Sequence, residues 1–231
     1  MKIAGIQKLT LLDYPGTVAC TLFTQGCNFR CPFCQNASLV LPEQYPDPLP
    51  SDEILDFLHK RYGILEGVAI TGGEPLLQPD IADFLTRVKE IGYRIKLDTN
   101  GTNPDALAEL LEEGLVDRVA MDIKASPDGY HVAAGLSCVA VDRIDKTRAL
   151  LMSGRVPFEF RTTVVNGIHN DEEIRKIAEW IAGDEEYYLQ QYRESGEIVD
   201  RTGLTSPDEA QMRHYADIVR AFVPNVQIRG L

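Results

Sequence analysis

The feature that most constrains the fold of this chain is a regular alternation of short apolar runs with amphipathic helical stretches. Residues 67–71 (GVAIT) have the composition of a buried strand. From Ile81 onward, apolar residues recur at i, i+3, i+4 and i+7, as on one face of a helix, and Gly92 is placed to end that helix. This unit of a strand followed by a helix is repeated along the chain.

The repeats predict six strand-helix units. The expected strands cover residues 17–23, 67–71, 93–98, 118–124, 158–165 and 187–191, with 226–229 as a candidate for a last strand. The expected helices include 51–62 and 141–153, and capping signals mark others at Asn103 with Pro104, at Asn170, and at residues 206–209 (SPDE), a capping box. Such alternation forms a parallel sheet with right-handed crossovers. Six units are too few to close an eight-stranded barrel, so we predict an α/β fold, a partial (β/α)6 barrel open at one side, in a single domain over residues 1–231.

Three cysteines in one short loop, residues 24–38, indicate metal chemistry. Cys27, Cys31 and Cys34 have the spacing Cys-x3-Cys-x2-Cys, which lets one loop reach three corners of an iron–sulfur cluster. A [4Fe-4S] cluster normally has four cysteine ligands, so a cluster held by three keeps one iron free to bind another molecule. Gly26 gives the backbone room to turn where the loop begins.

The loop alone also allows a zinc site or an inert cluster of thiols. Structural zinc has four tetrahedral ligands, usually in two separated pairs, and the remaining cysteines, Cys20 and Cys138, form no second pair in the sequence. A histidine could complete such a site, although the histidines are isolated in the sequence: His59, His131, His169 and His214. For Cys20 and Cys138 themselves, buried packing is the default expectation.

The net charge and the cysteine content indicate which kinds of partner the protein binds and in which cellular compartment it resides. A net charge of −12 argues against a surface that follows nucleic-acid phosphates, because such a surface needs clustered Lys and Arg. The sequence has no run that approaches the roughly 20 apolar residues of a membrane span, and its start does not have the pattern of a signal peptide. Five cysteines, three of them close together, fit a reducing compartment. We therefore expect a cytoplasmic protein that binds neither nucleic acid nor membrane.

Polar residues gather where the expected strands end, which is the catalytic edge of such a barrel. Gly72, Gly73 and Glu74 follow the second strand. Two adjacent glycines let the backbone approach a ligand and present N–H and C=O groups to it, and Glu74 supplies a carboxylate for an ammonium group. Taken alone, such a glycine pair is also typical of a simple turn.

Charged residues continue this pattern on the next three strands. Strand alternation places Lys96 and Asp98 on one face of the third strand, pointing into the barrel. Asp122 and Lys124 share the corresponding face of the fourth strand, and Arg161 lies in the fifth. Unpaired buried charges are costly, so these side chains either form internal ion pairs or bind a ligand.

Taken together and in this order, the motifs resemble those of the radical S-adenosylmethionine (SAM) superfamily, and more narrowly those of the activating enzymes of glycyl-radical enzymes. Residues 12–16 (LDYPG) and 23–36 (FTQGCNFRCPFCQN) are similar to activating proteins of anaerobic ribonucleoside-triphosphate reductase and to pyruvate formate-lyase activating enzyme. The resemblance covers essentially the whole chain. It implies a partial barrel of the radical SAM type.

The resemblance also implies the site residues. The implied metal ligands are Cys27, Cys31 and Cys34, and SAM would chelate the iron that they leave open. The implied SAM-binding residues are Phe33, Cys34, Gln35, Gly72, Gly73, Glu74, Asp98, Asp122, Lys124 and Arg161. Among these, Phe33 matches an aromatic residue near the adenine, and Asp98 and Asp122 could share a monovalent cation. Arg193 stands where pyruvate formate-lyase activating enzyme has a histidine, so it departs from the pattern.

The implied function is reductive cleavage of SAM at a [4Fe-4S] cluster to methionine and a 5′-deoxyadenosyl radical, which abstracts hydrogen from a glycine of a partner enzyme. That partner would be a glycyl-radical enzyme such as anaerobic ribonucleoside-triphosphate reductase, and a flavodoxin or ferredoxin would supply low-potential electrons. Two alternatives remain open. One is a single-cluster radical SAM enzyme that acts on a small molecule or peptide, and the other is a non-catalytic iron–sulfur or zinc binding module.

Overall fold

One sheet, whose strands follow each other in sequence order, organises the fold. The computed structural model describes residues 1–184, 186–194 and 196–231. The strands in these ranges are β1 (Ile3–Thr10), β2 (Ala19–Thr24), β3 (Gly67–Gly72), β4 (Arg94–Thr99), β5 (Arg118–Asp122), β6 (Phe158–Val164), β7 (Tyr187–Gln191) and β8 (Gln227–Arg229). β1 and β2 are antiparallel, and each later pair of neighbours is parallel. No ladder joins β1 to β8 in the described part of the chain, so the sheet is open there.

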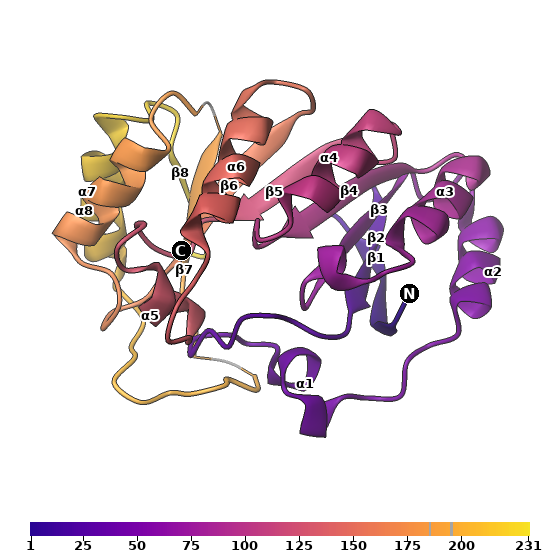
Figure 1. The fold of residues 1–231 in the computed structure, drawn as a ribbon, viewed down its shortest axis with the longest axis horizontal. Coiled ribbons are helices and arrows are strands. Elements are labelled where there is room, and N and C mark those ends of the chain that lie inside the picture. Colours follow the sequence, from indigo (N-terminus) through magenta and orange to yellow (C-terminus); the bar gives the residue numbers. More distant parts are fainter. Residues whose placement is uncertain (185, 195) are drawn as a thin grey trace.

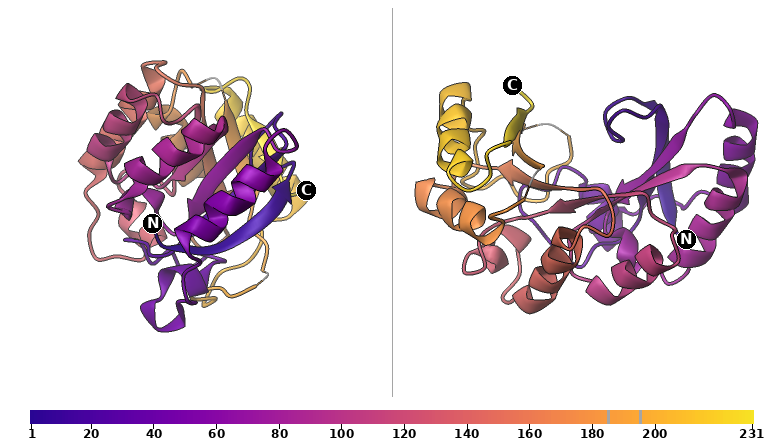
Figure 2. Two further views of the ribbon diagram at one scale, coloured as in Figure 1. Left: turned by 90° about the vertical axis from the view of Figure 1, so that its right-hand side faces the viewer. Right: turned by 90° about the horizontal axis from the view of Figure 1, so that it is seen from above.

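Helices connect the successive parallel strands. The described helices are α1 (Ala37–Val40), α2 (Ser51–Arg61), α3 (Ile81–Ile91), α4 (Pro104–Glu112), α5 (Tyr130–Ala134), α6 (Val141–Met152), α7 (Asp171–Trp180) and α8 (Glu209–Arg220), with short 3₁₀ turns η1 (Pro42–Gln44) and η2 (Pro75–Leu77). Figures 1 and 2 show α3, α4 and α6 along the outer face of the curved sheet. In the described ranges, no helix combines the length and apolar character needed to cross a bilayer.

The hydrophobic core lies between the helices and the outer face of the sheet. Leu22 in β2 and Leu97 in β4 are fully buried there, together with the apolar stripe of α3 that contains Phe84 and Leu85. Gly92 ends α3 with a left-handed φ of 107°, as its position in the sequence predicts. Alternate strand residues point to the inner face, which is left for polar side chains.

The predicted fold class is confirmed, and the last strand, β8, is present. β1, which pairs with β2 ahead of the first expected strand, was not predicted. Gln7 and Lys8 interrupt its apolar character and are exposed, because β1 is an edge strand with only part of its length buried. The short helices α1 and α5 were not predicted either, because they are too brief to show helical periodicity.

Of the three predicted helix starts, Asn103 and Asn170 lie at the N-cap position, but only Asn170 caps its helix with a side-chain hydrogen bond. The Asn170 side chain accepts a hydrogen bond from Glu173 N over 3.0 Å, which confirms the predicted cap of α7. The prediction of a capping box at residues 206–209 is wrong. Asp208 caps α8 instead, because its side chain accepts a hydrogen bond from Gln211 N over 2.8 Å. The Ser206 hydroxyl instead donates to the carbonyl of Tyr192.

Candidate active site

The cysteine loop follows directly from β2 and is fixed by main-chain hydrogen bonds. Gly26 N donates to Leu39 O and Glu74 N donates to Gly26 O, each over 2.8 Å, so the loop begins between α1 and the end of β3. Within the loop, Cys34 N donates to Cys31 O over 3.0 Å and closes a tight turn between these cysteines. Backbone groups therefore set the positions from which the thiols project.

The end of α5 supports one side of the loop. Arg30 N donates to Ala134 O over 2.8 Å, and the Arg30 guanidinium donates to Cys27 O over 2.7 Å. The next residue, Gly135, has a left-handed φ of 64°, and a Cβ at that position would lie 2.0 Å from Arg30 O. A glycine is therefore required where the helix meets the loop.

A segment after β7 supports the other side, and we call residues 196–200 the strap. Val199 N donates to Cys34 O over 3.1 Å, and Asp200 N donates to Pro32 O over 2.9 Å. These bonds join the C-terminal part of the chain to a loop more than a hundred residues earlier, and no pattern in the sequence indicated them.

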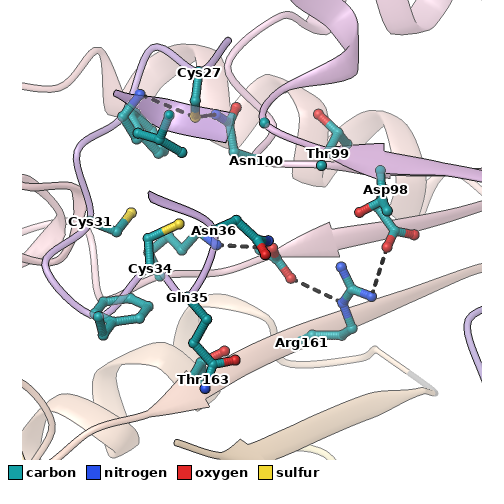
Figure 3. A pocket seen from close by; sticks show the side chains of 18 of the residues that line it. Cys27, Cys31, Cys34, Gln35, Asn36, Asp98, Thr99, Asn100, Arg161 and Thr163 are labelled. Atoms are coloured by element: carbon teal, nitrogen blue, oxygen red, sulfur yellow. Dashed lines mark hydrogen bonds and ion pairs between the residues drawn. The ribbon is translucent and has the colours of Figure 1, made fainter. Parts of the chain in front are cut away.

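A cavity of about 400 Å³ lies inside the barrel beside the loop (Figure 3). The described residues that line it are Asp13, Phe23, Cys27, Phe29, Cys31, Phe33, Cys34, Gln35, Asn36, Val40, Thr71, Gly72, Gly73, Asp98, Thr99, Asn100, Asp122, Lys124, Arg161, Thr163 and Gln190. The fold thus brings together nearly all the site residues expected from the sequence. The volume is in the range of small-molecule sites, about 300–1,000 Å³.

The three thiols border this cavity, and in the view of Figure 3 Cys31 and Cys34 lie next to each other with Cys27 apart from them. Burial raises the pKa of the Cys27 thiol to about 11 and that of the Cys31 thiol to about 12. In the metal-free protein these thiols therefore keep their protons near neutral pH. Coordination to a metal removes that proton and forms the thiolate ligand.

The glycine pair packs the end of β3 against the start of the cysteine loop. Gly73 N donates to Thr24 O over 2.9 Å, and Gly72 has a left-handed φ of 110°. A Cβ on Gly72 would lie 2.4 Å from Thr24 N. Both glycines also line the cavity, so their main chain is accessible to a ligand.

Glu74 occupies a different place from the one that the sequence predicted. Its carboxylate accepts hydrogen bonds from Leu76 N (3.0 Å), the Thr99 hydroxyl (2.9 Å) and Asn100 N (2.6 Å). It is 1% exposed and is not among the described residues that line the cavity. The structure therefore does not support a direct contact between Glu74 and an ammonium group; the carboxylate joins the ends of β3 and β4.

Five charged side chains form a continuous network on the inner face of β4, β5 and β6. Arg161 donates from Nη1 to Asp98 Oδ2 over 3.1 Å and from Nε to Asp122 Oδ1 over 3.0 Å (Figure 3). Lys124 Nζ donates to the other oxygen of Asp122 over 2.9 Å, and Lys96 Nζ pairs with Asp98. The nearby carboxylates of Glu159 and Glu186 are balanced by their ion pairs with Arg118 and Arg229. The three cations and two carboxylates of the network therefore leave one positive charge in surplus, which suits an anionic ligand.

The charges in this network stabilise one another despite their burial. Burial alone would raise the pKa of Asp122, but Arg161 and Lys124 outweigh it and hold the pKa below its usual range. Burial alone would lower the pKa of Lys124, but Asp122 raises it above the ordinary value. Asp122 and Lys124 are therefore both ionised at neutral pH.

Two buried side chains that the sequence did not single out for this role position Lys124. The Tyr130 hydroxyl accepts from Lys124 N and donates to Asp122 O, each over 3.2 Å. His169 Nδ1 accepts from Val165 N over 3.0 Å, so Nε2 carries the hydrogen that it donates to Lys124 O over 3.0 Å. Burial lowers the pKa of His169, which keeps the ring neutral in this role.

Comparison with known proteins identifies the family to which this chain belongs. The sequence model of the radical SAM superfamily matches residues 21–181. The chain belongs to the radical SAM superfamily. A Methanocaldococcus jannaschii protein named as a candidate glycyl-radical enzyme activating enzyme is 32% identical over 240 aligned positions, which cover 99% of this chain and 96% of that protein.

Two further comparisons extend the likeness. The pyruvate formate-lyase-activating enzyme of Clostridium pasteurianum is 33% identical over 144 residues, which cover 58% of this chain and 57% of that enzyme. The crystal structure of Streptococcus suis SuiB bound to S-adenosylmethionine has a TM-score of 0.68 at 17% identity, and the match covers 91% of this chain and 52% of SuiB. At this low identity the SuiB comparison shows the fold alone, including the open sheet.

Membership of the radical SAM superfamily implies a [4Fe-4S] cluster and SAM as cofactors, and the residues present fit both. Among the described residues, no three Cys, His, Asp or Glu donors converge as the ligands of a single ion do. Cys27, Cys31 and Cys34 all line the same cavity (Figure 3), and three thiols from one loop suit a [4Fe-4S] cluster with one open iron better than structural zinc, which takes four protein ligands. The cationic network beside them suits the carboxylate of SAM.

For this radical SAM enzyme, the structure changes the expectations for the shared cation and for Cys138, and it agrees with those for Arg193 and Cys20. The Arg161 guanidinium lies between Asp98 and Asp122, so the structure does not support a monovalent cation shared by these carboxylates. Arg193 donates to Gly230 O and does not line the cavity in the described part of the chain. Of the two remaining cysteines, Cys20 is buried as expected, whereas Cys138 is exposed.

Proposed function

We propose that this radical SAM enzyme activates a glycyl-radical enzyme, and that its specific partner is anaerobic ribonucleoside-triphosphate reductase. The observation that carries the activase role is the similarity over 99% of the chain to a protein named for that role. The narrower choice of partner rests on the resemblance of residues 12–16 and 23–36 to activating proteins of that reductase.

In this proposal the cysteine loop holds the cluster. Cys27, Cys31 and Cys34 are its ligands, and Asn100 Nδ2 lies 3.9 Å from Cys27 Sγ, where it can orient that thiolate. When bound, the cluster and SAM supply one-electron chemistry that yields a radical able to abstract hydrogen from carbon. The strap and the end of α5 keep the loop in place during turnover.

The charged network has the role of fixing SAM. Lys124 lines the cavity near Cys31 and keeps its positive charge at neutral pH, so it is the group placed to bind the SAM carboxylate. Asp122 and Arg161 hold Lys124 in position without neutralising the network as a whole. Gly72 and Gly73 present main-chain groups to the same end of the ligand, and the Phe33 ring lines the cavity beside the loop, where it can pack against the adenine.

The open side of the sheet gives a polypeptide access to the cavity. β1 and β8 form the two edges of that opening. Thr163 and Gln190 line the cavity with polar side chains that can bond to main-chain amides of an entering loop. Asn28, Gln35 and Asn36 of the cysteine loop are exposed, so a flavodoxin or ferredoxin could approach the cluster closely enough to reduce it.

An electron paramagnetic resonance experiment tests the proposal. The reconstituted protein is reduced anaerobically and incubated with SAM and the anaerobic ribonucleoside-triphosphate reductase of the same organism. We expect a glycyl radical signal that requires all the components. Formation of deoxyadenosine with no glycyl signal from this or any other glycyl-radical enzyme of the organism would instead favour a small-molecule or peptide substrate.

A further inference from the structure

Three exposed leucines lie at the end of β1 and in the turn that joins it to β2. Leu9, Leu11 and Leu12 are 56%, 68% and 85% exposed, and we call this group the leucine tip. Scattered exposed leucines need no explanation, but three within four positions of one turn form a local apolar surface. An exposed apolar surface beside a functional cavity often marks a place where another protein binds.

The turn that carries these leucines is rigidly built. The Thr10 hydroxyl oxygen accepts from Leu12 N over 3.2 Å and from Asp13 N over 3.1 Å. Farther along, Thr17 N donates to Tyr14 O over 3.0 Å, and Gly16 has a left-handed φ of 68° after Pro15. Both are features of well-defined turns, so the leucines are held outward by the backbone.

Tyr14 anchors the turn to the body of the protein. Its side chain is 4% exposed, and a Cβ on Gly67 would lie 2.9 Å from its ring, so the fit depends on that glycine. The Arg94 guanidinium lies 5.9 Å from the centre of the same ring. An anchored apolar tip loses little conformational entropy when a partner covers it.

The leucine tip adjoins the cavity through Asp13. Asp13 follows Leu12 directly, lines the cavity, and accepts a hydrogen bond from the Thr21 hydroxyl over 2.5 Å. The right-hand view of Figure 2 shows this indigo turn rising on the side of the sheet opposite the magenta helices. β1, which leads into the turn, is also one edge of the opening in the sheet.

We propose that the leucine tip docks against an apolar surface of the glycyl-radical enzyme, next to the loop that carries the target glycine. This inference rests on the proposed function, because a partner whose glycine enters the cavity must cover the surface that adjoins it. A second copy of this chain bound there would block the same entrance. The partner enzyme is therefore the occupant that the position favours.

The test compares the double variant L11S/L12S with wild type and with a control, V132S. Val132 is 52% exposed on α5, outside the turn, and does not line the cavity. All three proteins are reconstituted and assayed for deoxyadenosine without a partner, and for glycyl radical on increasing concentrations of the whole anaerobic ribonucleoside-triphosphate reductase. A short peptide that contains the target glycine of the reductase serves as a substrate too small to reach the leucine tip.

We expect the half-saturating concentration of the reductase to rise about tenfold in L11S/L12S, while deoxyadenosine formation and activity on the peptide stay at the wild-type level. V132S should match wild type throughout. Equal activation of the reductase by L11S/L12S and wild type would overturn the docking proposal, as would a wild-type dimer that the double variant converts to an equally active monomer. If wild type gives no glycyl radical, the proposed function fails first and the docking proposal fails with it.

Discussion

Gly73 lies directly against Gly26, because a Cβ on Gly73 would be only 2.0 Å from the carbonyl oxygen of Gly26. That carbonyl accepts the hydrogen bond from Glu74 N, which ties the end of β3 to the start of the cysteine loop. Main chain therefore meets main chain at this point, with no room for a side chain. Gly72 and Gly73 therefore position the cysteine loop in addition to lining the cavity.

Substitution of Gly73 by alanine should displace the cysteine loop. Overpacking of this kind costs about 1–3 kcal/mol, and here the obstacle is backbone, which cannot rotate away. We expect G73A to bind less iron after anaerobic reconstitution and to unfold at a lower temperature. The control is G5A, where a Cβ would meet no described atom within 4 Å. Full iron content in G73A would contradict this role.

Removal of the Lys124 charge should weaken SAM binding. A hydrogen bond to a charged group contributes about 1.5–3 kcal/mol, so we expect K124M to raise the Kd for SAM by roughly tenfold or more. Lys176, which pairs with Glu172 on the surface, provides the control K176M. Equilibrium binding to the reconstituted proteins measures the effect, and equal affinities in K124M and K176M would show that Lys124 does not contact SAM.

Glu74 should make stability depend on pH in an identifiable window. Burial raises its pKa from 4.5 to about 7. Between these values the folded protein keeps a proton that the unfolded chain has lost, so the free energy of unfolding falls as pH rises, by about 3 kcal/mol in total. Urea unfolding of metal-free wild type and E74Q at about pH 5 and about pH 8 should show a smaller decrease in E74Q. Parallel decreases would contradict the assignment.

Much of the fold follows from local patterns in the sequence. The α3 stripe that begins at Ile81, the Gly92 terminator and the Asn170 cap all depend on residues close in sequence, and the structure confirms each of them. The edge strand β1 could not be found in this way, because its stability comes from pairing with β2 rather than from its own composition. Ser206 was assigned to a cap because the sequence does not show that the Tyr192 carbonyl lies within its reach.

The residues that line the cavity were predictable where alternate residues of neighbouring strands share the inner face of the sheet, as Asp98, Asp122 and Arg161 do. Contacts between distant segments were not predictable, and the strap on the cysteine loop is the main example. Glu74 shows the same limit, since the donors that turn its carboxylate away from the cavity come from η2, from the last residue of β4 and from the residue after it. Spacing indicates which residues lie together, but not which partner each side chain selects.

Loosening the strap should make the cluster easier to remove. V199P eliminates the N–H that donates to Cys34 O, whereas V199A keeps it and changes only the side chain. We expect V199P to lose iron to a chelator several times faster than V199A, because the segment that covers Cys34 is no longer bonded to it. Equal rates of iron loss, followed by the absorbance of the cluster, would show that the strap does not retain the loop.

Transfer of deuterium from the partner to SAM-derived deoxyadenosine tests the central claim most directly. The anaerobic ribonucleoside-triphosphate reductase is prepared with glycine deuterated at the α-carbon and incubated with SAM and the reduced protein. C31A, which removes a cluster ligand, and C138S, which alters an exposed cysteine outside the loop, serve as matched variants.

If Cys27, Cys31 and Cys34 hold a cluster that lets SAM react with a partner glycine, wild type and C138S will yield deoxyadenosine that carries deuterium, together with a glycyl radical. C31A will yield neither. Deoxyadenosine without deuterium in the presence of the labelled reductase, or undiminished activity in C31A, would contradict the account.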